Sequence, residues 1–120
     1  MIGHVDTGLY GELIFRGFFV VPQALVDAAP SLALDAHARW LVVVLIRHEY
    51  MHHNLRPTIA SLAKECGELR LATKLRLDLL CDSGLLVLDP PLSVLASDTP
   101  FRFDLTPIWE KLAIATDSES

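Results

Sequence analysis

The longest apolar run of the chain, Trp40 to Ile46, lies within a helical pattern that extends from Ala36 to about Tyr50. Trp40, Leu41, Val44 and Leu45 recur at helical spacing, and further aliphatic residues fill the other sides of the same helix. Asp35 comes just before the segment and is a favoured helix N-cap residue. The pattern therefore predicts a helix that is apolar nearly all round, as a helix at the centre of a domain is.

Two more helices are predicted after this one. Residues 59–66 form an amphipathic pattern behind a Thr58 cap, and Gly67 can supply the turn because glycine adopts positive φ without steric cost. A third helical pattern runs from about Leu69 to Asp82 and stops at Gly84. Its spacing puts one set of residues in the core, namely Thr73, Leu77 and Leu80. The solvent-facing set is Arg70, Leu71, Lys74, Leu75 and Asp78.

The remaining segments predict short extended pieces and two flanking helices. Strands are expected at 13–15, 18–21, 85–88, 92–96 and 101–105, and helices at 23–29 and after Thr106-Pro107. We interpret residues 1–12 as a flexible arm, 13–115 as one domain and 116–120 as a frayed tail. The predicted fold is mainly α with a small β wing, in the order of a winged helix-turn-helix.

Composition narrows the possible partners. With 120 residues the chain suits a single domain, and its 52% hydrophobic content makes a second protomer or another protein a candidate cover for apolar surface. The net charge of −5 argues against a protein that coats nucleic acid through bulk charge. Locally the picture differs, because residues 56–80 hold five basic and three acidic side chains, a net +2, which leaves −7 for the rest.

The two cysteines, Cys66 and Cys81, form no C-x-x-C pair, so free thiols in a reducing compartment are expected. No basic-then-apolar signal peptide opens the sequence, and the longest apolar run is too short to span a bilayer. The expected protein is soluble and cytoplasmic, with no membrane partner.

Pro57 to Leu88 resembles the winged-helix unit in the N-terminal domains of DnaD-like and plasmid or phage replication initiators. The matching residues are Pro57, Ile59, Leu62, Ala63, Gly67, Gly84, Leu85 and Leu86. The segments FFVVPQAL and FRFDLTPIWEKL extend the likeness to roughly residues 18–112. The resemblance implies binding of double-stranded DNA in replication initiation or plasmid and phage control, with transcription regulation as a close variant.

Within this interpretation the third helix would lie in the major groove, which is wide enough to admit it. Arg70 and Lys74 are the leading candidates for DNA contact. The candidate phosphate contacts are Arg56, Lys64, Arg76 and Arg102.

A second hypothesis assigns the same domain to protein binding with little affinity for DNA. Leu71, Leu75 and Leu79 form an i, i+4, i+8 stripe, Leu69 stands where a serine or threonine cap is usual, and the wing has Arg102 as its one cation. The stripe either packs against the N-terminal arm or closing helix, or binds a partner. A homodimer or another replication protein is the candidate partner, because the resemblance also implies oligomerisation.

His48 to His52 matches H-E-x-x-H, the zinc-peptidase pattern that places two imidazoles on one helix face. No third-ligand extension follows, and Arg56-Pro57 breaks the helix soon after the motif. Histidines near a helix C-terminus also have a plain electrostatic role. We therefore predict no metal site, no cofactor and no enzyme activity, and interpret the motif as the polar end of the central helix.

Overall fold

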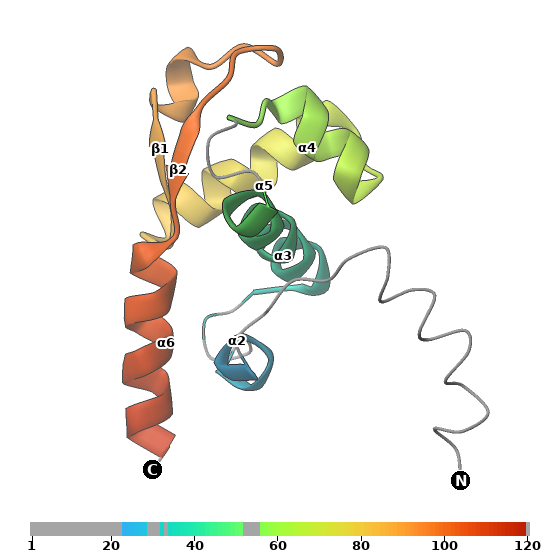
Figure 1. The fold of residues 1–120 in the computed structure, drawn as a ribbon. Helices are drawn as coiled ribbons and strands as arrows, with labels where there is room; N and C mark the ends of the chain where they lie inside the picture. The colour runs from blue at the N-terminus through green and yellow to red at the C-terminus, as the bar shows by residue number, and fades with distance from the viewer. Residues whose placement is uncertain (1–22, 29–31, 33, 52–55, 120) are drawn as a thin grey trace, which may run out of the picture.

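The structure is a computed structural model that describes residues 23–28, 32, 34–51 and 56–119. In chain order its elements are α2 (Gln23–Ala28), α3 (Ala36–Met51), α4 (Ile59–Cys66), α5 (Arg70–Asp82), β1 (Val87–Asp89), the 3-10 helix η2 (Leu92–Val94), β2 (Arg102–Asp104) and α6 (Thr106–Glu119) (Figure 1). This confirms a mainly helical fold with a small antiparallel sheet. The arm predicted at 1–12 and the strands predicted at 13–15 and 18–21 lie outside the described residues.

Helix α3 lies in the middle of the molecule, as its apolar pattern predicts (Figure 1). Asp35 caps it, because its Oδ1 accepts a hydrogen bond of 2.7 Å from the Ala38 backbone N–H. Its buried side chains are Leu41, Val42, Val44, Leu45 and Ile46. Trp40 shares their helical spacing but is 52% exposed, so α3 is not covered all round.

The turn between α4 and α5 is closed by backbone hydrogen bonds around Gly67. This glycine has φ 69° and ψ 34°, a left-handed conformation that other residues adopt at a cost. The N–H of Glu68 donates to the Ala63 carbonyl at 2.9 Å, and the N–H of Gly67 donates to the Lys64 carbonyl at 3.2 Å. At the other end of α4, the Thr58 and Ser61 side chains form a capping box.

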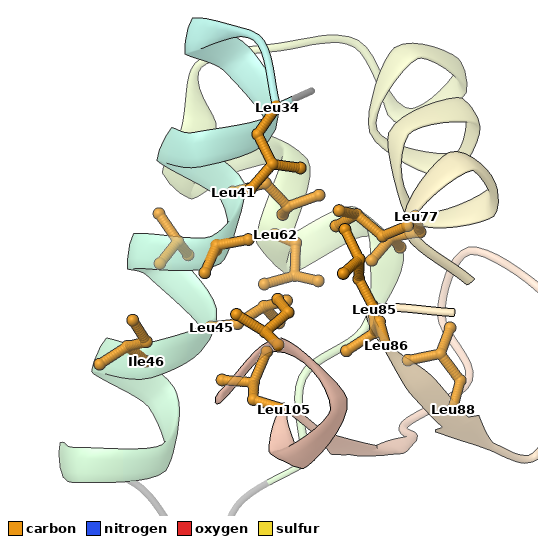
Figure 2. Close-up of a cluster of buried hydrophobic side chains, with 14 of the residues drawn as sticks. Leu34, Leu41, Leu45, Ile46, Leu62, Leu77, Leu85, Leu86, Leu88 and Leu105 are labelled. Carbon is orange, nitrogen blue, oxygen red and sulfur yellow. The ribbon is translucent and has the colours of Figure 1, made fainter. Parts of the chain in front are cut away.

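Leucines from all three central helices meet in the core (Figure 2). Leu45 of α3, Leu62 of α4 and Leu77 of α5 are each fully buried. Ala63 is also buried, and its small side chain suits a close approach of helices beside the turn. Thr73 is the one polar residue in the core of α5, and its hydroxyl donates to the Leu69 carbonyl at 3.2 Å. The predicted inward face of α5 is confirmed.

Strands β1 and β2 form a hairpin with Leu88 opposite Phe103 and Asp89 opposite Arg102. The first strand begins two residues later than predicted, at Val87. The extended piece predicted at 92–96 is wrong, because hydrogen bonds from Val94 N–H to the Pro91 carbonyl and from Leu95 N–H to the Leu92 carbonyl close a 3-10 turn there.

The loop between the strands is bonded to the start of α4. The Ala60 N–H donates to the Ser97 carbonyl, and the Phe101 N–H donates to the Pro57 carbonyl, both at 3.0 Å. Phe101 itself is fully buried in the core. The hairpin is therefore held against the three-helix core rather than projecting freely.

Helix α6 begins at Thr106 and packs against α2. The first helical residue is Thr106, one residue earlier than the predicted Thr106 cap implies, and Asp104 Oδ1 accepts a hydrogen bond of 2.9 Å from its N–H. Hydrogen bonding from the side chain of Thr106, and then from its backbone N–H, holds the pKa of Asp104 below its usual value. The helix continues to Glu119, so residues 116–119 of the predicted tail are helical.

Replacing Gly67 with alanine should destabilise the fold by about 1–2 kcal/mol, because an L-residue is strained in the left-handed region. A Cβ at this position would meet no atom within 4 Å, so the cost comes from the backbone alone. Gly67→Asn should cost less, since asparagine tolerates this conformation. Urea unfolding checks this order, and an alanine variant as stable as the asparagine variant would contradict it.

Candidate nucleic-acid interface

The outward face of α5 is fixed by what the opposite face buries. Thr73, Leu77 and Leu80 point into the core. Helical periodicity then directs the remaining positions away from the core, and all the residues predicted to face solvent are exposed. The exposed residues of this helix are Arg70, Leu71, Lys74, Leu75, Asp78, Leu79 and Asp82.

Arg70 and Lys74 are one helical turn apart in the N-terminal half of α5. Both side chains are exposed, and neither forms an ion pair with any residue in the described part of the chain. Their charges are therefore available to an external ligand. The two residues with the strongest prediction for DNA contact are placed where a ligand can reach them.

Arg76 differs from these two residues, because its charge is used inside the fold. Its guanidinium lies 2.9 Å from Glu68 Oε2, and the two side chains are only 22% and 15% exposed. Glu68 Oε1 also lies 3.4 Å from His37 Nδ1 at the start of α3. Arg76 thus joins α5 to the turn and, through Glu68, to α3.

The other three predicted cations lie on three different elements. Arg56 precedes α4, Lys64 is in the last turn of α4, and Arg102 is on β2, all of them exposed. Arg102 stands directly opposite Asp89 across the sheet.

Acidic side chains lie on the same elements as these cations. Asp78 and Asp82 continue the spacing of Arg70 and Lys74 along α5, and both are exposed. Asp89 and Asp104 are exposed on the hairpin strands. The exposed cations in the described part of the chain therefore form no continuous basic surface.

No residue in the described part of the chain covers the leucine stripe. Leu71, Leu75 and Leu79 are 69%, 56% and 64% exposed, so α6 does not cover them, and the N-terminal arm lies outside the described residues. Leu69 stands just before α5, where a serine or threonine cap is usual, and it is 79% exposed. A contiguous row of exposed large aliphatic side chains is a feature of interaction surfaces. Asp82 is the residue of this face that sequence reasoning missed, although its i+4 spacing from Asp78 could have found it.

The H-E-x-x-H segment is engaged in contacts between helices. His48 is 11% exposed, and its Nε2 lies 2.7 Å from Glu65 Oε1. An ionised carboxylate can only accept, so Nε2 carries the proton in this contact. Arg47 Nη1 lies 3.3 Å from the other oxygen of Glu65. The pair joins α3 to the end of α4, while His52 and His53 lie outside the described residues.

Among residues whose placement is described, no three His, Cys, Asp or Glu side chains gather closely enough to hold a metal ion. Within the same residues, no helix is long and apolar enough to cross a membrane. No protein-family model matches the chain, and no curated protein matches it in sequence.

Removing Glu65 should weaken the attachment of α3 to α4. We expect Glu65→Ala to lower the free energy of unfolding by about 1–2 kcal/mol, because it removes a charge-assisted hydrogen bond to a nearly buried imidazole. Arg47→Ala should cost less than about 0.5 kcal/mol, since Arg47 is half exposed and its contact is a surface ion pair. Denaturant unfolding of both variants is the measurement, and equal losses would contradict the assignment.

The free thiols should be poor nucleophiles near neutral pH. Partial burial, and then the carboxylates of Glu68 and Glu65, raise the pKa of Cys66; partial burial, and then Asp78 and Asp82, raise the pKa of Cys81. Since the thiolate is the reactive form, alkylation by iodoacetamide should be slower than in urea-unfolded chain and should still rise with pH above 9. A Cys66→Ser variant isolates Cys81. A rate that levels off below pH 9 would contradict the raised pKa.

Proposed function

We propose that the chain is a winged helix-turn-helix protein that binds double-stranded DNA, with α5 as the helix that enters the major groove. The element order supports the fold assignment: α3, then α4 and α5 joined by a tight turn, then the β1–β2 hairpin. The hairpin is bonded to the start of α4, so it would stand beside α5 as a wing does.

The single observation that carries the DNA proposal is the exposure of Arg70 and Lys74 at the start of α5, with no ion pair in the described chain. In helix-turn-helix proteins the N-terminal residues of the second helix reach the base edges. An arginine there can bond guanine in a bidentate manner, and a lysine can contact either a base or a phosphate.

The remaining cations would have supporting roles. Arg56 and Lys64 lie at the two ends of α4, the helix that would cross the DNA backbone, and Arg102 lies on the wing, so each could contact phosphate. Arg76 was predicted to contact phosphate, but its pairing with Glu68 suits it better to hold the start of α5 in position.

The biological setting rests on the resemblance to DnaD-like and plasmid or phage initiators alone. Replication initiation or plasmid and phage control is the setting we propose, with transcription regulation as the close variant. Both settings use the same interface.

A second candidate function is protein binding with little DNA affinity. The observation that favours it is the exposure of Leu71, Leu75 and Leu79, each more than half exposed. Apolar side chains contribute little to DNA recognition beyond contact with thymine methyl groups, whereas they are the usual centre of protein interfaces.

Arg70→Ala combined with Lys74→Ala should reduce affinity for duplex DNA at least about tenfold at low salt and make its salt dependence shallower, because contacts to base and phosphate are lost together. Fluorescence anisotropy over a salt series is the measurement.

The matched control is Arg47→Ala combined with Lys111→Ala, which removes the same two residue types from α3 and α6. It should leave both affinity and salt slope close to those of the parent chain. If the two double variants weaken binding equally, the effect is one of net charge and α5 is not the interface. If the parent chain gives no binding at low salt, the DNA proposal is wrong and the protein-binding candidate stands.

A further inference from the structure

The exposed face of α5 carries charges of opposite sign in its two halves. Arg70 and Lys74 occupy the N-terminal half, and Asp78 and Asp82 continue the same spacing into the C-terminal half. None of the four forms an ion pair with another residue in the described ranges. The stripe of Leu71, Leu75 and Leu79 runs beside this row of charges.

This arrangement is complementary to itself when reversed. If a second α5 lies antiparallel against the first with the two Leu75 side chains in contact, each Leu71 meets a Leu79 of the other copy. Each Lys74 then stands near an Asp78 of the other copy. A parallel two-fold arrangement would instead place the two charge rows on opposite sides of the leucine contact, so Lys74 and Asp78 would not meet across it.

We propose that two copies of this chain associate antiparallel through α5, about a two-fold axis at Leu75. Such an interface is isologous, since each copy contributes the same surface. A two-fold axis perpendicular to the helices leaves both charge rows on the same side of the leucine contact, so the two Lys74–Asp78 pairs form together. The leucines supply the buried apolar centre, and the charges fix direction and register.

The inference goes beyond the proposed DNA binding and does not depend on it. The two are connected, however, because the dimer would use Lys74 for contacts with the acidic half of the other helix. A copy paired in this way could not place the same face of α5 in a major groove. Association and DNA binding through α5 would therefore compete.

The expected affinity is modest. The face is one helix wide and has three leucines at its centre, which places it among transient interfaces of less than about 1,200 Å². We therefore expect weak association, with a dissociation constant on the order of tens of micromolar. The dimer should then be seen only as concentration rises.

Sedimentation velocity from about 1 µM to about 1 mM tests the pairing, a range that brackets the expected dissociation constant. The parent chain should shift from monomer to dimer. Lys74→Glu makes the central charges all negative and Asp78→Lys makes them all positive, so each variant alone should weaken the dimer at least about tenfold. An equimolar mixture of these two variants should dimerise, because each copy then supplies the charges that the other lacks.

The matched control is the double variant Lys74→Glu with Asp78→Lys, which exchanges the two charges within one chain and should dimerise like the parent. Circular dichroism of each single variant confirms that α5 remains folded. A parent chain that stays monomeric to the top of the range overturns the proposal. So does a mixture that associates no better than its components, or a dimer that survives Leu75→Glu.

The same set of variants separates this proposal from the DNA proposal. Leu75→Glu should abolish the dimer, but it keeps Arg70 and Lys74. In this monomeric background, Arg70→Ala combined with Lys74→Ala should still weaken DNA binding. DNA binding with no dimer would overturn only the pairing, and a dimer with no DNA binding would overturn only the DNA proposal.

Discussion

The position of α5 depends on the left-handed turn at Gly67 and on the contacts that hold this turn against α3. The Glu68 N–H closes the end of α4, while the Glu68 side chain reaches both Arg76 and His37. Three residues earlier, Glu65 reaches His48 near the other end of α3. With Leu62 and Leu77 buried on either side of the turn, α5 can bury only one face, and its charges and leucines must lie on the other.

The helices were predictable because local rules and burial agree there. Asp35 and Thr58 cap helices, and Gly67 makes the turn, at the positions that their chemistry predicts. The buried residues of α5 follow from the 3.6-residue period of a helix. The 3-10 turn at 92–94 was not predictable from its residues, because an apolar run of this length fits either an extended or a turned backbone. The hydrogen bond that supports the start of α6 was missed because Asp104 reaches forward to Thr106 from the end of a strand.

For the candidate interface, the sequence was enough to place Arg70, Lys74 and the three leucines on the surface, since helical spacing alone decides this. It was not enough to separate Arg76 from them. Its ion pair with Glu68 spans the turn, and no spacing within one helix reveals a contact of that kind. For the same reason His48 looked like part of a motif along one helix, whereas its contact is with Glu65 on another.

We propose the outward face of α5 as the functional surface, with DNA as its principal ligand. An NMR titration of the isotopically labelled chain with short duplex DNA tests this most directly, at low salt and a protein concentration well below that of dimerisation. The account predicts the largest amide shifts at Arg70 to Lys74, with smaller ones near Lys64 and Arg102. Shifts confined to α3 or α6, or none at all, would contradict it.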